Sequence, residues 1–207
     1  MTRRAMGLWA SGSLAAACVL GAIAVFWLGG STVVDTWWHD LMVDTRPDAL
    51  IVVSHVMNRI GGGWIAVFVV PLLIAAILAL TRRWRSALFA LAAFAASALL
   101  VQLLKHLFGR ARPDDMLVIS DYGSFPSGHT ANAATIAVVL WLLFPRVWVA
   151  VAGAAWIVLM ALSRTVLAVH WVSDTAGGAF VGAAAALIVG VLLLPWARAD
   201  REMEEST

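Results

Sequence analysis

Residues 86–107 read SALFALAAFAASALLVQLLKHL. An α-helix needs about 20 mostly apolar residues to cross the hydrocarbon core of a bilayer, and this stretch has that length. Apolar side chains would cover the helix on all sides, as expected of a helix that faces lipid and other helices. Its one residue with a permanent charge, Lys105, stands near the end. The stretch therefore predicts a membrane-spanning helix that brings a cation to one membrane surface.

The composition of the whole chain extends this prediction. Of the 207 residues, 62% are hydrophobic and 13% are charged, whereas soluble domains average about 45–50% apolar and about 25% charged residues. The mean hydropathy of +0.91 excludes both a soluble globule and a disordered chain. Six stretches have the character of a membrane span: residues 8–29, 64–80, 86–107, 127–144, 147–167 and 175–196.

The segment between the first two spans, residues 30–63, has a different pattern. Apolar residues recur in it at helical spacing, with Asp35, His39 and Asp40 between them. This pattern predicts short helices that lie in the outer membrane interface. The expected fold is thus all-α: a polytopic membrane protein with six transmembrane helices, in a single domain that spans residues 1–207.

Two further counts exclude other classes of protein. The single cysteine, Cys18, excludes a disulfide scaffold and a cysteine-rich zinc site. The formal net charge of +2 is too small to indicate a nucleic-acid partner.

Basic residues predict the orientation, because cytoplasmic loops of membrane proteins are enriched in Lys and Arg. With a cytoplasmic N-terminus, eight basic residues fall on the inner side and six on the outer side. Three of the six, Lys105, Arg112 and Arg164, belong to the candidate site described below, which leaves eight against three. We therefore expect a multi-pass protein of the cell membrane, with both termini in the cytoplasm and the candidate site on the extracytoplasmic side.

Polar residues gather at the predicted outer ends of the last four spans. Ionisable groups at membrane depth are costly, so by default they indicate function. The candidates are Lys105, Arg112, Ser127, Gly128, His129, Arg164, His170 and Asp174. With one carboxylate, the set lacks the acidic cluster that binds Mg²⁺ or Ca²⁺, and we expect neither a metal nor a cofactor.

Several of these residues suit an anionic phosphate group. Lys105, Arg112 and Arg164 supply three positive charges, two of them on forked guanidinium groups that match phosphate oxygens. Ser127 and Gly128 stand at the start of the fourth span, where free backbone N–H groups of a helix make an anion site. Gly128 also lets the backbone approach a ligand closely.

The remaining candidates suit nucleophilic catalysis. His170 and Asp174 are four residues apart and would share one face of a helix. The carboxylate would then fix the imidazole tautomer and stabilise its cationic form, as a nucleophilic histidine requires. His129 would act as a general acid toward a leaving oxygen.

Each residue also has a simpler interpretation when it is taken alone. Arg110 and Arg112 are then ordinary loop charges, and Lys105 extends its side chain to the membrane interface. Ser127 only caps a helix, and the histidine–aspartate pair is a contact on a helix surface. Their combination, in this order and on one side of one membrane, favours a functional site.

The candidates also form three motifs. These are Lys105-x6-Arg112-Pro113, Pro126-Ser127-Gly128-His129 and Ser163-Arg164-x5-His170-x3-Asp174. They resemble the three signatures of the type 2 phosphatidic acid phosphatase (PAP2) superfamily, complete and in order. Together with the six spans, the resemblance extends over most of the chain and points to the membrane-bound branch of that superfamily.

The resemblance implies a metal-independent lipid phosphatase whose active site faces away from the cytoplasm. His170 would attack phosphorus and form a phosphohistidine, with Asp174 orienting the ring and His129 protonating the leaving oxygen. The residues that would hold the phosphoryl oxygens are Lys105, Arg112, Ser127, Gly128 and Arg164. The expected partners are a membrane lipid phosphate or diphosphate and the bilayer itself, with no nucleic acid and no obligate protein partner.

The sequence gives less information about the substrate than about the reaction. Thirteen arginines against one lysine suggest a GC-rich bacterial genome, and a compact bacterial member of this kind makes undecaprenyl or another polyprenyl diphosphate the first choice. Phosphatidylglycerophosphate and phosphatidic acid are the alternatives. A protein that binds or transports a lipid phosphate without cleaving it is the non-enzymatic alternative.

Overall fold

The computed structural model describes the backbone of residues 1–204 and the side chains of residues 1–199. Within this part of the chain all regular structure is helical, so the predicted all-α fold is confirmed. The elements are α1 (Arg3–Ala22), η1 (Ile23–Trp27), α2 (Val33–Thr45), α3 (Asp48–Gly61), η2 (Ile65–Val69), α4 (Val70–Leu80), α5 (Trp84–Phe108), α6 (Gly128–Leu143), α7 (Val147–Val166) and α8 (Val172–Glu204). The end of the predicted single domain, residues 205–207, lies outside the described residues.

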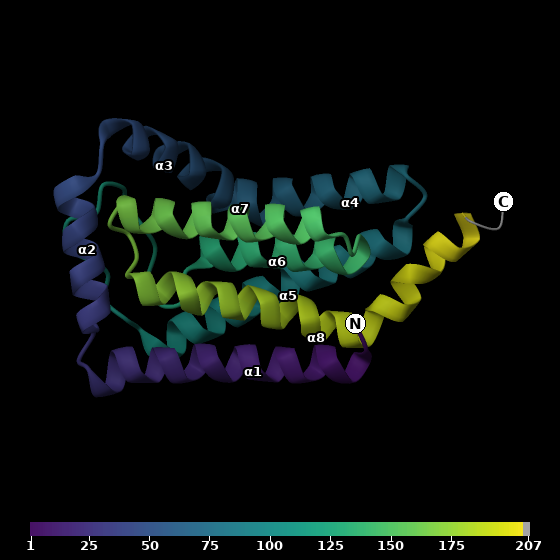
Figure 1. Cartoon of the computed structure of the whole chain (residues 1–207), viewed down its shortest axis with the longest axis horizontal. Coiled ribbons are helices and arrows are strands. Elements are labelled where there is room, and N and C mark those ends of the chain that lie inside the picture. The colour runs from purple at the N-terminus through teal and green to yellow at the C-terminus, as the bar shows by residue number, and fades with distance from the viewer. Residues whose placement is uncertain (205–207) are drawn as a thin grey trace.

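The long helices run side by side, and α2 lies across one end of the bundle (Figure 1). Two short helices, α2 and α3, thus occupy the segment that predicts them. The N-terminus lies at the end of the bundle opposite α2. The π-helical turn η1 continues α1, and the π-helical turn η2 leads into α4.

Helix α8 is central, because it packs against α1, α5 and α6. Close packing of helices in lipid depends on small residues at the contact. A Cβ atom at Gly182 of α8 would collide with the backbone carbonyl of Ala131 in α6. Farther along, the buried side chains of Phe89, Leu142 and Leu194 join α5, α6 and α8 in one apolar core. These contacts hold together three of the helices that carry the candidate site.

Length and composition identify four of the described helices as candidate membrane spans: Arg3–Trp27, Trp84–Phe108, Val147–Val166 and Val172–Ala199. The pair Asp48–Gly61 and Ile65–Leu80, bent by 53°, makes a fifth if it is counted as one span. Helix α6 has 16 residues, which at about 1.5 Å per residue falls short of a hydrocarbon core about 30 Å thick. Most of α6 is buried among α5, α7 and α8, so it needs little lipid contact. All six predicted segments are helical, whereas six full membrane crossings remain a prediction.

Candidate active site

A cavity of about 710 Å³ lies between α3, α4, α5 and α6. Its polar end is lined by Lys105, Asp121, His129 and His170. Gly128 also lines it, and the walls toward α4 and α5 are mostly apolar. The cavity thus brings together predicted site residues from three motifs that lie far apart in the sequence.

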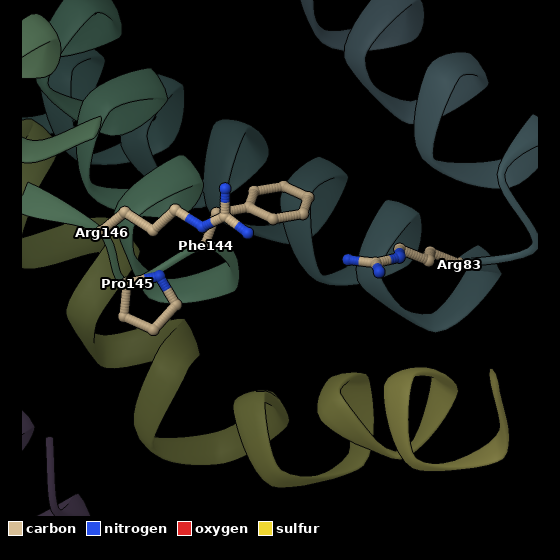
Figure 2. A pocket seen from close by; sticks show the side chains of 4 residues that line it. All are labelled: Arg83, Phe144, Pro145 and Arg146. Carbon is tan, nitrogen blue, oxygen red and sulfur yellow. The ribbon is translucent and has the colours of Figure 1, made fainter. Parts of the chain in front are cut away.

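Another cavity, of about 340 Å³, lies at the opposite end of the bundle and is lined by Arg83, Phe144, Pro145 and Arg146 (Figure 2). The guanidinium carbon of Arg83 is 5.2 Å from the centre of the Phe144 ring. Arg83 and Arg146 precede the first turns of α5 and α7, and both belong to the basic residues expected on the cytoplasmic side. The lining of this cavity contains no predicted site residue, so the larger cavity is the candidate active site.

His170 and Asp174 meet at the start of α8. His170 lies in the turn that follows α7, and Asp174 lies in the first turn of α8. His170 Nδ1 is 3.4 Å from Asp174 Oδ2, and both side chains are buried. The Trp171 N–H donates to the same oxygen at 2.8 Å, and the positive end of the helix dipole favours a carboxylate there. The pair therefore forms across a helix start and not, as the spacing predicts, along one helical face, because α8 begins only after His170.

Asp174 determines which nitrogen of His170 is available. Its ionised carboxylate can only accept, so the proton of the neutral ring lies on Nδ1, which faces it at 3.4 Å, and Nε2 carries the lone pair. Arg112 Nη1 lies beside the ring, 3.2 Å from Nε2 and 3.5 Å from Nδ1. Burial lowers the pKa of His170 to about 4 against the opposing effect of Asp174, so the ring is neutral at physiological pH.

Lys105 and Arg112 converge on one oxygen, Asp121 Oδ1. Lys105 Nζ lies 3.2 Å from it and Arg112 Nη2 lies 2.6 Å from it. Both cations also donate to the Gly123 carbonyl, at 2.6 and 3.0 Å. Burial alone would raise the pKa of Asp121, but the charges of Lys105 and Arg112 outweigh it and hold this pKa below its ordinary value. An anionic oxygen thus already lies between two of the predicted phosphate-binding residues.

Arg164, the third predicted cation, is fully buried and held by α3. Its Nη1 donates to Asn58 Oδ1 at 2.6 Å, and its Nη2 donates to the Ser54 carbonyl at 3.3 Å. The Asn58 carbonyl oxygen lies 3.3 Å from His129 Nε2. Asn58, which has no part in the sequence motifs, therefore links Arg164 to the candidate general acid.

Ser127 is buried and caps α6. Its Oγ accepts from the Thr130 N–H at 3.5 Å, and its own N–H donates to the Asp174 carbonyl at 3.0 Å. These bonds tie the start of α6 to the start of α8. Because the hydroxyl is engaged in the cap, phosphate binding at this helix start would use the N–H groups of Gly128 and His129.

Two buried charges behind Asp174 were not predicted as site residues. Arg110, which the sequence suggests as loop charge, is 2% exposed and contacts both Asp35 and Asp174. Asp35 comes from α2 and is fully buried. One local signal for Asp35 is present, because Thr32 and Asp35 have the spacing of a capping box and form one. Arg110 and Asp35 are 75 positions apart, so no local pattern joins them.

A sequence model of the PAP2 superfamily matches residues 86–198, more than half of the chain. A lipid A 1-phosphatase from Rhizobium johnstonii is 35% identical over 111 residues, which cover 46% of this chain and 43% of that protein. Phosphatidylglycerophosphatase B from Bacillus subtilis is 32% identical over 111 residues, which cover 49% of this chain and 55% of that protein. The chain thus spans about half the length of these two relatives.

Solved structures extend the similarity. The crystal structure of the first transmembrane PAP2 type phosphatidylglycerolphosphate phosphatase, from Bacillus subtilis, has a TM-score of 0.73 at 26% identity and covers 87% of this chain and 93% of that chain. The crystal structure of Aquifex aeolicus LpxE has a TM-score of 0.62 at 26% identity and covers 73% of this chain and 91% of that chain. The shared helical arrangement therefore continues well beyond the region that carries the motifs.

Proposed function

Because this chain belongs to the PAP2 superfamily, we propose that it is a membrane lipid phosphatase that works through a phosphohistidine. The geometry of His170 carries the proposal: its side chain lines the cavity, its Nδ1 faces the buried carboxylate of Asp174, and Arg112 lies beside its ring. A neutral imidazole held in this way directs its lone pair toward an anion site, as a nucleophile must. The family membership that the three motifs predict is confirmed.

The reaction proceeds in two steps. His170 Nε2 attacks phosphorus, the bond from phosphorus to the leaving oxygen breaks, and His129 donates a proton to that oxygen. Asp174 stabilises the positive charge that develops on the His170 ring. In the second step His129 accepts a proton from water, the water oxygen attacks phosphorus, and the phosphorus–nitrogen bond breaks. Inorganic phosphate leaves and His170 returns to its neutral form.

The phosphoryl group binds at the polar end of the cavity. Lys105 and Arg112 already share the Asp121 oxygen, and a phosphate oxygen binds to the same two cations beside that carboxylate. The N–H groups at the start of α6 supply further donors beside it. Fixed positive groups of this kind stabilise the charge on the transferred phosphoryl group without a metal ion.

The apolar walls of the cavity support a lipid substrate. Beyond Lys105 the lining consists of side chains such as Val101 and Phe94 of α5, with Phe68 and Leu72 on the opposite wall. Binding sites of this kind combine an apolar lining with a few polar groups that orient the ligand. A hydrocarbon chain lies along these walls while the phosphate reaches the polar end.

For the substrate itself, phosphatidylglycerophosphate is the first lipid to test. The Bacillus subtilis structure, whose alignment covers most of both chains, is named as a phosphatase of that lipid. Lipid A 1-phosphate follows from the curated relatives, and undecaprenyl diphosphate and phosphatidic acid follow from the sequence. A lipid that carries a terminal phosphate is common to all of them.

The cavity faces away from the cytoplasm in our proposal, and the protein lies in the cell membrane with both termini inside. The basic residues Arg82, Arg83 and Arg146 lie at the other end of the bundle, and the N-terminus lies at that end as well. Cytoplasmic ends of membrane helices are enriched in such residues.

Phosphate release from the four lipids by the purified protein tests the proposal, with and without EDTA and with His170→Ala as the control. Wild type should release phosphate and the variant should not. Activity should survive EDTA, because lysine and arginine side chains supply the positive charge at the phosphate. Loss of activity in EDTA with rescue by Mg²⁺ would overturn the metal-independent mechanism. Binding of the lipids by wild type without phosphate release would favour the non-enzymatic alternative.

A further inference from the structure

The Asp174 carboxylate divides its two oxygens between two sets of partners. Oδ1 accepts from Arg110 Nη1 at 2.5 Å. Oδ2 accepts from the Trp171 N–H at 2.8 Å and from Ser124 Oγ, and it faces His170 Nδ1 at 3.4 Å. Because Arg110 holds one oxygen, the other is directed toward the imidazole, and a rotation of the carboxylate would break both arrangements.

Arg110 is itself held through all three of its nitrogen atoms. Nε donates to the Gly30 carbonyl, Nη1 also donates to Ser173 Oγ, and Nη2 donates to Asp35 Oδ2, each at 2.7 Å. Its side chain is fully buried. The rigid fork of a guanidinium group fits such a set of acceptors in one orientation. Arg110 is therefore held in place and can fix the orientation of the Asp174 carboxylate.

Asp35 balances the charge of Arg110. Its Oδ1 accepts from the Ser173 N–H at 2.9 Å, and its Oδ2 accepts from Ser173 Oγ at 2.8 Å and from the Thr32 N–H at 3.0 Å. Two buried carboxylates thus flank one buried guanidinium. Buried charges without a counter-charge are costly, and this arrangement leaves one excess negative charge for the His170 ring.

We propose that Arg110 and Asp35 are positioning residues for phosphoryl transfer: Arg110 fixes the Asp174 carboxylate so that Oδ2 faces His170, and Asp35 neutralises Arg110 from the other side. This inference rests on the proposed phosphohistidine reaction. Neither residue is part of the cavity lining, so both act through Asp174 and not on the substrate. Helix α2 then has a role in the reaction through Asp35.

The main test variant is the double substitution Arg110→Met with Asp35→Asn. It removes one cation and one anion together, so Asp174 keeps its charge and the net charge of the three groups is unchanged. The matched control is Arg46→Met, because Arg46 donates to the Val166 carbonyl at 2.8 Å and belongs to neither the cavity nor the motifs. For the folded fraction of each protein we would measure kcat, KM, inhibition by inorganic phosphate, and the titration of His170 by nitrogen NMR.

The double variant should lose kcat by up to about 100-fold, because a misplacement of about 1 Å in a reacting group has an effect of that size. KM and phosphate inhibition should stay within about twofold of wild type, since the groups that hold the phosphate are unaltered. His170 should titrate at lower pH than in wild type, because an Asp174 carboxylate that no longer faces Nδ1 stabilises the protonated ring less. The charged or titratable groups that face His170 are otherwise unchanged: Asp174, Lys105, Arg112, Asp121 and His129.

Arg110→Lys is a second test variant for the case in which the double variant does not fold. It keeps a cation at this position and should retain more of the rate than the double variant does. A folded double variant with the kcat of the Arg46→Met control would overturn the inference, as would a rise in KM that accounts for the whole loss. If wild type releases no phosphate, the proposed function fails, and the His170 titration still decides the inference. An unchanged titration in the double variant would then overturn it.

Discussion

Asp121 lies where the phosphate is expected, and the substitution Asp121→Asn tests what its charge does there. Its Oδ1 is 3.2 Å from Lys105 Nζ and 2.6 Å from Arg112 Nη2. Asparagine keeps the shape of the side chain and an oxygen for these donors, but it removes the negative charge. Although burial opposes them, the two cations hold the pKa of Asp121 below its ordinary value, so the wild-type side chain is ionised at neutral pH.

The size of the effect follows from electrostatics. A phosphate dianion on the same two cations would lie about 5 Å from the Asp121 carboxylate. At that distance the two negative charges of the phosphate and the single negative charge of Asp121 repel by about 1.7 kcal/mol in water. The solvent value applies because the Asp121 side chain is 63% exposed. Salt reduces the repulsion further, to about 1 kcal/mol, which corresponds to about fivefold in binding. We therefore expect Asp121→Asn to lower KM and the inhibition constant of inorganic phosphate about fivefold.

Inhibition of phosphate release by inorganic phosphate, measured at low and high salt, checks this expectation. The control is Asp114→Asn, which removes an exposed carboxylate of the same loop outside the cavity lining and so changes the net charge equally. The difference between the two variants should shrink as salt is added. Weaker inhibition in Asp121→Asn than in wild type would refute the reasoning, because it would show that Asp121 holds Lys105 and Arg112 in place for the phosphate.

Three further predictions concern the reacting groups and the membrane orientation. His170→Ala should trap no labelled phosphate on the protein after rapid quenching, whereas His129→Ala should still accumulate phosphoenzyme slowly from a substrate with a good leaving group; label on a histidine in His170→Ala would place the nucleophile elsewhere. Burial lowers the pKa of His170 to about 4, so the neutral, nucleophilic ring should persist as the pH falls and become protonated only as the pH passes through that value. A nitrogen NMR titration of the free enzyme checks this, and a midpoint near the ordinary value of about 6.5 would contradict it. In a cysteine-free background, Ile119→Cys should react with a membrane-impermeant thiol reagent in intact cells and Arg82→Cys should not, and the opposite labelling would refute the proposed orientation.

The helices could be predicted from the sequence because hydropathy is a local property. The stretch 86–107 becomes α5, Trp84–Phe108, and the stretch 127–144 becomes α6, Gly128–Leu143. Ser127 stands at the start of α6 as its N-cap, which its residue type alone favours. The candidate residues Lys105, His129 and His170 could also be predicted, because motif spacing identifies them without knowledge of the fold.

Contacts between residues far apart in the sequence could not be predicted in this way. Arg164 and Asn58 are 106 positions apart, and either residue alone has several ordinary roles. The His170–Asp174 pair shows a second limit, because a spacing of four residues does not reveal on which residue a helix begins. Helix α8 begins at Val172, so the pair meets across a helix start and depends on other groups to orient the carboxylate.

Two of the supporting residues lie outside the part of the chain that identifies the family. The family match begins at residue 86 and includes every residue that we propose to react, whereas Asp35 and Asn58 come from α2 and α3. Asp35 reaches Asp174 through Arg110, and Asn58 contacts both Arg164 and His129. One short segment between the first two predicted spans therefore supports the proposed nucleophile on one side and the proposed general acid on the other. Since Asp35 acts on the orientation of Asp174 and is not part of the cavity lining, changes at Asp35 should alter kcat more than KM.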